Sequence, residues 1–370
     1  MKKTLLITSF FPPRIGGIEN YFHNLCSNLD ADKIIVLTQE DQNTKEFDNK
    51  QKYSIYRTDF FDGKFPPRWR SLKKKVKKII DEKGIEQIAF GNFHFYNLVG
   101  LKFGLPYICY GHGTDIASVG DKFGSKWAFK KVYGGCKHFI ANSQYLAHKI
   151  EKLAEDNSKI KVIYCGVNVE ALNSPVEDLI GKKKIIGISE SDIVLLSVGR
   201  LVEIKNYAGI IKLMPLILQT IPNLKYVIVG GGPKYLELVD LATQLGVANN
   251  VKFVGAVPDE TSSKAFYYQM AHIFIGVSKV PEGLGISYLE AQACRTPIIA
   301  SNTGGATEAV INNKTGLLVN ADNDNEIVDA IISLAKDSEL WTRLADNGQN
   351  MIKQEFDLSV QIKKNIEILS

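Results

Sequence analysis

Two glutamates in the second half of the chain flank a glycine-rich turn, and both carboxylates could bind sugar hydroxyls. Glu282 opens the turn and Glu290 follows eight residues later, and the intervening run begins Gly283-Leu284-Gly285-Ile286. Glycines let a backbone approach a phosphate closely, and carboxylates accept hydrogen bonds from vicinal hydroxyls. One acid could hold a hexose and the other a ribose, with a diphosphate between them. The structural alternatives are an exposed loop acid at Glu282 and a favourable charge near a helix N-terminus at Glu290.

Two cations, Arg200 and Lys205, lie in a single loop after an apolar run. A guanidinium binds phosphate oxygens as a fork and an ammonium binds them as a point charge, so both side chains could reach one diphosphate. The alternative is a solvated loop that carries two unrelated surface charges.

A pair of glycines, Gly16 and Gly17, follows the first apolar run and precedes a helical pattern. Such a pair lets the backbone approach a phosphate, and the helix N-terminus offers free N–H groups. The spacing is not the GxGxxG dinucleotide fingerprint, and no suitably placed ribose-binding acid follows it, which disfavours a dehydrogenase. A plain tight turn is the structural alternative.

A histidine flanked by glycines, His112, ends another apolar run, and from the end of a parallel strand its ring would face a ligand. Asp115 follows in the same loop. Its carboxylate could join the site or could cap the next segment.

The elements that must position these residues are β-type apolar runs alternating with helical patterns, which is typical of parallel sheets covered by helices. The expected strands of the first half are 4–9, 33–37, 54–57, 87–90, 107–110, 138–141 and 161–164. Those of the second half are 192–197, 224–229, 251–254, 273–276, 297–300 and 316–319. The sequence therefore predicts an α/β protein of two Rossmann-like, doubly wound domains that face each other across a cleft, with ligands at the carboxyl ends of the strands.

The stretch 168–188 has the composition of a domain boundary, with Pro175, Gly181 and a run of lysines. We expect an N-terminal, acceptor-side domain over 1–172 and a C-terminal, donor-binding domain over 173–356. A last helix over 357–370 is expected to pack back onto the first domain. Pro215 predicts a kink or break in the helical segment 207–219.

Together and in this order, these segments resemble the retaining glycosyltransferases of family 4, which have the GT-B fold. The resemblance extends over nearly the whole chain, and further matching pieces are 141–143, 166–168, 229–233, 254–258, 304–308 and 315–319. The family's usual acid after Gly-Val is Asn168 here. We expect this departure to affect an interdomain contact more than the chemistry.

The resemblance implies a role for each candidate residue. Arg200 and Lys205 are expected to neutralise the donor diphosphate and its leaving group, and Glu290 to bind the ribose hydroxyls. Glu282 and His112 are expected beside the transferred hexose. The backbone contacts to the donor are expected from Gly16, Gly17, Gly255, Ala256, Gly283, Leu284, Gly285 and Ile286. The expected catalytic set is His112, Arg200, Lys205 and Glu282.

The predicted chemistry needs neither a metal nor a cofactor. The two DxD-like runs, 30–32 and 322–324, lie in turn-forming stretches, so cations and helix N-termini must stabilise the leaving group. The resemblance implies a UDP- or GDP-sugar donor and retention of configuration. Because no carboxylate stands out as a covalent nucleophile, we favour front-face attack assisted by the donor phosphate. The acceptor is expected to be a glycan or a lipid-linked sugar, in assembly of surface polysaccharide, lipopolysaccharide or glycolipid.

The most basic segment, 65–80, combines lysines with an apolar stripe at helical spacing, formed by Trp69, Leu72, Val76, Ile79 and Ile80. Over 68–80 it could lie on an anionic membrane, with about 1 kcal/mol from each basic group near the surface. The alternative is a scaffold helix whose stripe packs on the sheet and whose lysines are solvated.

The bulk composition is that of a globular protein: 45% hydrophobic and 23% charged residues, with a formal charge of +5. This mild charge does not indicate a nucleic-acid partner. Five scattered cysteines without a CxxC pair indicate reduced thiols in the cytoplasm. The apolar N-terminus is interpreted as a buried strand, and no run reaches the roughly 18 apolar residues of a membrane span. We therefore expect a cytoplasmic protein, peripheral on the inner face of the membrane if 68–80 binds it.

Three other functions could use the same fold: a sugar-nucleotide epimerase, a glycan phosphorylase and a non-catalytic sugar-nucleotide-binding module. The two glutamates together with Arg200 and Lys205 favour transfer to an acceptor. A phosphorylase would also need a lysine-bound pyridoxal phosphate. A binding module is expected to have lost Glu282 or His112, and this chain has both.

Overall fold

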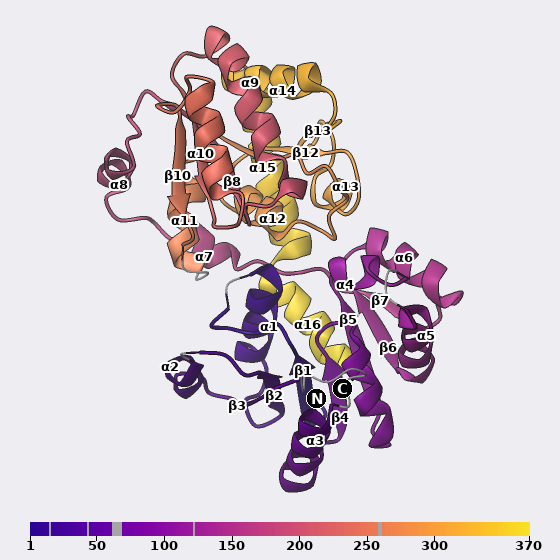
Figure 1. Cartoon of the computed structure of the whole chain (residues 1–370). Helices are drawn as coiled ribbons and strands as arrows, with labels where there is room; N and C mark the ends of the chain where they lie inside the picture. The colour runs from indigo at the N-terminus through magenta and orange to yellow at the C-terminus, as the bar shows by residue number, and fades with distance from the viewer. Residues whose placement is uncertain (15, 43, 61–68, 121–122, 258–260) are drawn as a thin grey trace. The chain divides into compact units, whose positions relative to one another are not determined.

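The computed structural model describes residues 1–14, 16–42, 44–60, 69–120, 123–257 and 261–370 (Figure 1). The chain divides into two compact units, one of residues 1–166 with 359–370 and the other of residues 167–358. Each unit has its own parallel sheet covered by helices. This arrangement confirms the predicted α/β class with two doubly wound domains.

The first unit has a seven-stranded parallel sheet in the order β3-β2-β1-β4-β5-β6-β7. Its strands are β1 (Thr4–Thr8), β2 (Ile34–Gln39), β3 (Ser54–Thr58), β4 (Gln87–Phe90), β5 (Tyr107–Gly111), β6 (His138–Ala141) and β7 (Ile160–Val162). The order reverses beside β1, so the loops after β1 and β4 diverge there, and this is where doubly wound sheets bind ligands. The predicted strand positions are confirmed to within a few residues at each end.

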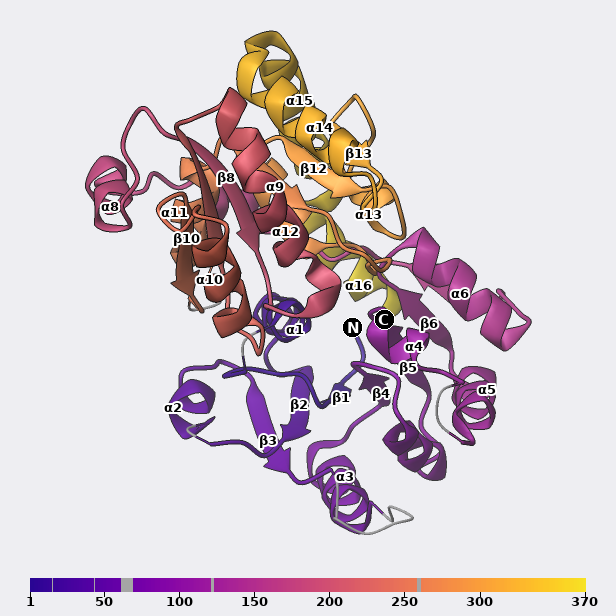
Figure 2. The same cartoon turned by 45° about the horizontal axis from the view of Figure 1, so that its top comes forward.

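Helices cover both faces of this sheet. They are α1 (Gly17–Ser27), α2 (Thr44–Asn49), α3 (Arg70–Lys83), η1 (Phe95–Lys102), α4 (Thr114–Ala117), α5 (Ser125–Gly135), α6 (Gln144–Ala154) and α16 (Leu358–Ile368). Apolar side chains of α3, η1, α5 and α6 form one buried cluster with alternate strand residues, including Leu5 and Ile7. These four helices therefore share one layer, and α1 lies on the other side of the sheet (Figure 2).

The C-terminal helix α16 packs in the first unit. The Asn365 side-chain oxygen accepts hydrogen bonds from the Tyr110 hydroxyl at 2.8 Å and from the Tyr21 hydroxyl at 3.3 Å, and all three residues are buried. The Leu369 carbonyl accepts from the Lys2 amide at 2.9 Å and from the Gln87 side chain at 2.8 Å. Both ends of the chain are thereby joined to the same sheet.

The second unit has a six-stranded parallel sheet in the order β10-β9-β8-β11-β12-β13. Its strands are β8 (Ile193–Val198), β9 (Leu224–Val229), β10 (Val251–Gly255), β11 (Ile273–Gly276), β12 (Ile298–Ser301) and β13 (Gly316–Val319). The order reverses beside β8, so the loops after β8 and β11 flank the switch point. Those two loops carry Arg200 with Lys205 and the Glu282 turn.

The helices of the second unit also lie on both faces of its sheet (Figure 1). They are α7 (Val169–Asn173), α8 (Leu179–Ile185), η2 (Glu203–Lys205), α9 (Tyr207–Thr220), α10 (Tyr235–Gln244), α11 (Thr261–Met270), α12 (Ile286–Ala293), α13 (Ala306–Ala309), α14 (Asp324–Lys336), α15 (Ser338–Met351) and a π-helical turn (Ile352–Phe356). None of the helices in the described part of the chain is long and apolar enough to cross a membrane.

Two local predictions need correction. The boundary was placed after residue 172, but α7 belongs to the second unit. Tertiary contacts explain this, because Asn173 donates to the Ala293 carbonyl at 2.9 Å and Gln269 donates to the Leu172 carbonyl at 2.6 Å. Pro215 was expected to kink or break its helix. The break does not occur, because Pro215 lies inside α9, which runs on to Thr220 and buries Met214 and Ile217 in the core.

Candidate active site

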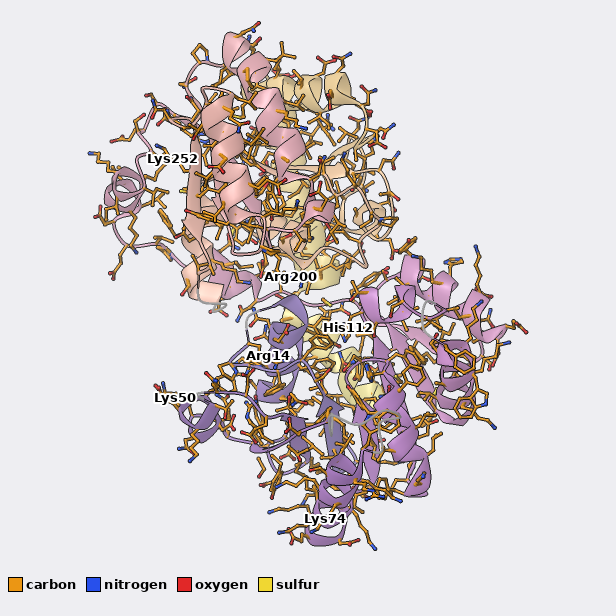
Figure 3. All side chains as sticks on the ribbon, in the orientation of Figure 1. Arg14, Lys50, Lys74, His112, Arg200 and Lys252 are labelled. Carbon is orange, nitrogen blue, oxygen red and sulfur yellow. The ribbon has the colours of Figure 1, made fainter. Side chains whose placement is uncertain are left out.

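The loop after β8 carries the predicted phosphate-binding cations. Arg200 is exposed there (Figure 3), and Lys205 ends the short helix η2. The loop packs closely on the glycine run after β9, where the Leu201 amide donates to the Gly231 carbonyl at 2.9 Å. A Cβ on Gly230 would lie 1.9 Å from the Gly199 carbonyl oxygen, and Gly230 has a φ of +145°. Only glycine fits this approach, which fixes the path of the Arg200 loop.

Lys205 and Glu282 form an ion pair in the second unit. The Lys205 ammonium donates to Glu282 Oε2 at 2.8 Å, with side chains 28% and 15% exposed. The other carboxylate oxygen, Oε1, accepts from the hydroxyls of Ser278 and, at 3.1 Å, Tyr288. Burial alone would raise the pKa of Glu282, but Lys205 and these hydrogen bonds outweigh it, and the pKa lies below its ordinary value. Glu282 is therefore an ionised, firmly held acceptor at neutral pH and not an exposed loop acid.

Ser278 and Tyr288 were not identified from the sequence. The Tyr288 hydroxyl also donates to the Gly276 carbonyl at 2.7 Å, so it links the end of β11 to the Glu282 carboxylate. Both residues lie within ten positions of Glu282, and polar hydroxyls so close to a candidate acid are the signal that could have found them.

The glycine-rich turn after Glu282 leads directly into α12. Gly285 has a φ of +87° and immediately precedes the helix, whereas Leu284 is 1% exposed, so its side chain belongs to the core and its backbone alone could meet a ligand. The turn rests on a second glycine pair, because the Gly305 amide donates to the Glu282 carbonyl at 2.9 Å. A Cβ on Gly305 would lie 1.9 Å from the Gly283 carbonyl oxygen.

Glu290 lies on the second turn of α12 and is 8% exposed. Its carboxylate accepts from the Lys264 ammonium at 2.9 Å and from the Tyr268 hydroxyl at 2.6 Å. Neither partner was identified from the sequence. Their spacing of four residues on α11 places them on one helix face, which is the only local signal that they act together.

The predicted base-binding turn, Gly255-Ala256, follows β10. Gly255 has a φ of +86°, and its carbonyl accepts from the Gly230 amide at 2.8 Å, which joins this turn to the glycine run after β9. Ala256 is exposed. Pro258, which belongs to the matching motif, lies outside the described residues.

In the first unit His112 follows β5 and is 9% exposed. Its Nε2 lies 2.9 Å from the Gly91 carbonyl oxygen, so Nε2 carries the proton. The rings of Tyr21 and Phe22 pack edge-on against it at 5.5 and 5.3 Å. Burial lowers the pKa of His112 although nearby Asp115 acts in the opposite direction. The imidazole is therefore neutral at pH 7, with Nδ1 left as an acceptor.

Asp115 organises the His112 loop. Its Oδ1 accepts from three backbone amides at 3.0 Å each, those of His112, Gly113 and Ile116, and its Oδ2 accepts from the Phe93 amide at 3.0 Å. A carboxylate that accepts hydrogen bonds from four backbone N–H groups stabilises the loop and has little capacity left to bind a ligand. Of the two roles considered for Asp115, the geometry supports capping.

The predicted Gly16-Gly17 contact lies at the start of α1, which begins at Gly17. Ile15 of the same motif lies outside the described residues. Glu19 in the first turn folds back, and a Cβ on Gly16 would meet its carboxylate at 2.2 Å. This negative charge occupies the helix N-terminus that was expected to attract phosphate. A direct phosphate contact here is therefore less favourable than the sequence suggested.

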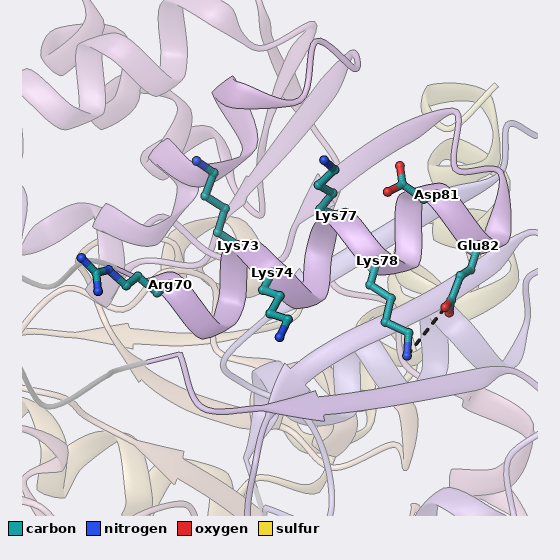
Figure 4. A pocket seen from close by; sticks show the side chains of 7 residues that line it. All are labelled: Arg70, Lys73, Lys74, Lys77, Lys78, Asp81 and Glu82. Carbon is teal, nitrogen blue, oxygen red and sulfur yellow. Dashed lines mark ion pairs between the residues drawn. The ribbon is translucent and has the colours of Figure 1, made fainter.

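The basic helix α3 has a surface hollow of about 490 Å³, lined by Arg70, Lys73, Lys74, Lys77, Lys78, Asp81 and Glu82 (Figure 4). The apolar stripe, for which contact with a membrane or with the sheet was left open, is part of the core: Leu72, Val76 and Ile79 are at most 1% exposed. The structure thus supports the scaffold alternative for the stripe. Arg68 and the residues from 65 to 67 lie outside the described residues. The hollow is remote in sequence from every predicted catalytic residue.

No group of three or more His, Cys, Asp or Glu side chains able to hold a metal ion occurs among the residues that the structure describes.

Two family models match the chain, one in each half. Glycosyltransferase Family 4 matches residues 15–171, and Glycosyl transferases group 1 matches residues 180–351. A GDP-mannose-dependent monoacylated alpha-(1-6)-phosphatidylinositol monomannoside mannosyltransferase of Corynebacterium glutamicum is 28% identical over 386 residues, covering 100% of this chain and 98% of that protein. A GDP-mannose-dependent alpha-(1-6)-phosphatidylinositol monomannoside mannosyltransferase of Mycolicibacterium smegmatis is 26% identical and covers 99% and 98%.

Solved structures show the same fold. Anabaena HepE in complex with UDP and glucose superimposes with a TM-score of 0.86 at 21% identity, covering 99% of both chains. WaaG, a glycosyltransferase involved in lipopolysaccharide biosynthesis, superimposes with a TM-score of 0.75 at 16% identity, again over 99% of both. The predicted GT-B fold is confirmed. With matches to both halves of the chain, we conclude that this protein is a glycosyltransferase of family 4, of the glycosyl transferases group 1 type.

Proposed function

We propose that the enzyme transfers a hexose from a nucleotide-diphosphate sugar to an acceptor hydroxyl, with retention of configuration and without a catalytic metal. The observation that carries the proposal is the Lys205–Glu282 ion pair, with the exposed Arg200 in the same loop as Lys205. The two loops that flank the switch point of the second sheet carry these three groups. They supply two cations for a diphosphate and an ionised acceptor for sugar hydroxyls.

The two cations are placed to bind the leaving group, whereas the Glu282 carboxylate is placed to bind the sugar. An ammonium has three N–H donors, and Lys205 uses one of them on Glu282, so two can reach phosphate oxygens. Arg200 adds a guanidinium fork and has no ion pair within the described part of the chain. These cations stabilise the charge that develops on the nucleoside diphosphate as the glycosidic bond breaks.

The way Glu282 is held argues against a covalent intermediate on this carboxylate. A carboxylate that accepts hydrogen bonds from Lys205, Ser278 and Tyr288 is a weak nucleophile. We therefore favour attack on the face from which the leaving group departs, with a donor phosphate oxygen taking the acceptor proton. A glycosyl-enzyme adduct trapped on Glu282 would contradict this. His112, neutral and with Nδ1 as an acceptor, is suited to a sugar hydroxyl.

The donor is a UDP- or GDP-sugar. The mannosyltransferase relatives are GDP-mannose-dependent, and the HepE complexes contain UDP or UDP-glucose. The test is thermal stabilisation by UDP, GDP and their common sugar conjugates, with and without EDTA, because a ligand that binds the folded state raises its melting temperature. We expect one base to give a clear shift that EDTA does not change and that Arg200→Ala and Glu290→Ala remove. No shift with any nucleotide would refute the donor assignment.

We propose a lipid-linked or glycan acceptor and attachment to the anionic cytoplasmic face of a membrane. Relatives act on a phosphatidylinositol mannoside, which is a membrane lipid. Because the stripe of α3 is buried, attachment through this helix must be electrostatic, through Arg70, Lys73, Lys74, Lys77 and Lys78. Each basic group contributes about 1 kcal/mol near an anionic surface, and added salt screens it.

The helix α5 offers a second contact in the same layer as α3. Trp127 is 59% exposed, and the neighbouring Lys126, Lys130 and Lys131 are exposed as well. An amphipathic ring beside lysines is typical of side chains at a membrane interface.

The test compares binding to vesicles of phosphatidylglycerol and phosphatidylcholine. We expect binding to the anionic vesicles only, a blue shift of tryptophan emission on binding that Trp127→Phe removes, and loss of binding when Lys73, Lys74, Lys77 and Lys78 become glutamates. Absence of binding at low salt would refute the attachment without affecting donor recognition.

A further inference from the structure

We propose that Lys264 and Tyr268 are positioning residues that hold the Glu290 carboxylate for the ribose hydroxyls of the donor nucleotide. The inference rests on the proposed function, in which Glu290 binds the ribose. It adds two residues of α11 to a site whose predicted members lie on other elements.

The Glu290 carboxylate is buried together with both of its donors. Lys264 Nζ donates to Glu290 Oε1 at 2.9 Å, and Tyr268 Oη donates to Glu290 Oε2 at 2.6 Å. Lys264 and Glu290 are each 8% exposed and Tyr268 is fully buried. Because each carboxylate oxygen has its own donor, the carboxylate can neither rotate nor exchange its oxygens without losing a charge-assisted or short hydrogen bond.

The acceptor capacity of Glu290 matches a vicinal diol. A carboxylate has about four lone-pair sites, two on each oxygen. Lys264 and Tyr268 occupy one site on each oxygen, so one remains free on each. Two neighbouring hydroxyls, such as the 2′-OH and 3′-OH of a ribose, would complete the set. Lys264 also supplies the charge that a buried carboxylate needs before and after the nucleotide binds.

A purely structural role would be to join α11 to α12 and the strand that follows. Other contacts also hold α11, to α7 and to the segment between α12 and β12. The Thr296 hydroxyl donates to the Tyr268 carbonyl at 2.9 Å, and Gln269 donates to the carbonyls of Leu172 and Ser174 at 2.6 and 2.8 Å. These bonds involve neither Lys264 nor the Tyr268 hydroxyl. The helix is thus held by bonds other than the ion pair, and the effect specific to Lys264 and the Tyr268 hydroxyl is the orientation of the Glu290 carboxylate.

The experiment measures the dissociation constants of UDP, GDP, their 2′-deoxy counterparts dUDP and dGDP, and inorganic pyrophosphate by titration calorimetry. Variants are Lys264→Met, Tyr268→Phe and Glu290→Gln, with Lys336→Met as a matched control at an exposed lysine of the same unit. We expect the wild type to prefer the ribonucleotide about tenfold or more over its deoxy form, which corresponds to one hydrogen bond to a charged group.

In Lys264→Met and Tyr268→Phe we expect that preference to fall towards one, while pyrophosphate binding stays at the wild-type value. A variant that only loosened the fold would weaken the ribonucleotide, the deoxynucleotide and pyrophosphate alike. Because Lys264→Met leaves Glu290 without its counter-charge, the double variant Lys264→Met/Glu290→Gln removes both charges if the single variant does not fold. Tyr268→Phe keeps the shape of the side chain and provides a second, independent measurement.

The outcomes distinguish failure of the positioning role from failure of the ribose assignment to Glu290. If Glu290→Gln loses the ribose preference but Lys264→Met and Tyr268→Phe keep it, the positioning role is wrong and the proposed function stands. If the wild type binds neither UDP nor GDP, or if Glu290→Gln keeps the preference, the ribose assignment itself is wrong and the inference falls with it.

Discussion

Replacing Gly305 by alanine tests whether the Glu282 turn owes its position to close backbone packing. The added Cβ would lie 1.9 Å from the Gly283 carbonyl oxygen and 2.9 Å from Leu284 Cα. To reach the 3.4 Å of an ordinary contact, the turn and the Gly305 backbone must separate by roughly 1.5 Å. Gly305 has a φ of −68°, which alanine adopts without strain, so the effect comes from packing alone.

This displacement should lower both the stability of the protein and its catalytic rate. Overpacking of this kind costs about 1–3 kcal/mol of unfolding free energy. Displacing a binding group by about 1 Å can cost about 100-fold in rate, because the reacting atoms leave their productive geometry. Since Glu282 begins the displaced turn and its carbonyl accepts from the Gly305 amide, we expect Gly305→Ala to lose about 2 kcal/mol of stability and about 100-fold in kcat/KM.

The assays are urea denaturation and initial-rate kinetics with the nucleotide sugar identified by thermal shift. Gly134→Ala is the matched control, because a Cβ there meets nothing within 4 Å and the residue lies exposed in α5. The same substitution should stabilise that helix by about 0.5–1 kcal/mol. Stability within about 0.5 kcal/mol of wild type together with unchanged kinetics in Gly305→Ala would refute the packing argument.

Four further results are expected. Lys205→Met should cost about 2 kcal/mol of unfolding free energy by leaving a part-buried carboxylate unpaired, and Glu282→Gln should restore most of it in the double variant, as measured by urea denaturation. Asp115→Ala should cost about 3 kcal/mol or more, because four backbone N–H groups lose their acceptor; a loss below 1 kcal/mol in the same assay would contradict the capping role. The pKa of His112 is lower in the folded protein, so the unfolded chain takes up the proton first as the pH falls. The contribution of His112 to the free energy of unfolding is therefore fully present above about pH 6.5 and is lost as the pH drops below it. His112→Gln should lose less stability than wild type between pH 7.5 and 5.5, and an identical loss would show that His112 does not titrate in this way. Burial raises the pKa of every thiol, so native protein at pH 7.5 should resist iodoacetamide while denatured protein is labelled at Cys26, Cys109, Cys136, Cys165 and Cys294, as mass spectrometry would show.

Part of the candidate site could be identified from the sequence because its signals are local. Glycines in the loops that follow buried strands allow close backbone approach, and this signal indicated the turn before α12 and the loop after β8. The partners of the two acids could not be identified in this way. Lys205 lies 77 residues before Glu282, and Lys264 lies 26 residues before Glu290, so the pairs exist only once the strands are in order.

The sequence by itself determined the two parallel sheets, since strands buried on both faces read as short apolar runs such as Thr4–Thr8, and it indicated the family through motifs that follow those strands. The tertiary structure decided what each amphipathic or polar pattern contacts. The apolar stripe of α3 could have contacted lipid or protein. In the fold it packs on the sheet, which buries Leu72, Val76 and Ile79. The Asp115 carboxylate could have bound a ligand. In the fold it accepts hydrogen bonds from four backbone amides of the loops after β4 and β5. The physical reason is the same in each case: periodicity and propensity act over a few residues, whereas burial and charge pairing depend on which distant segments the fold brings together.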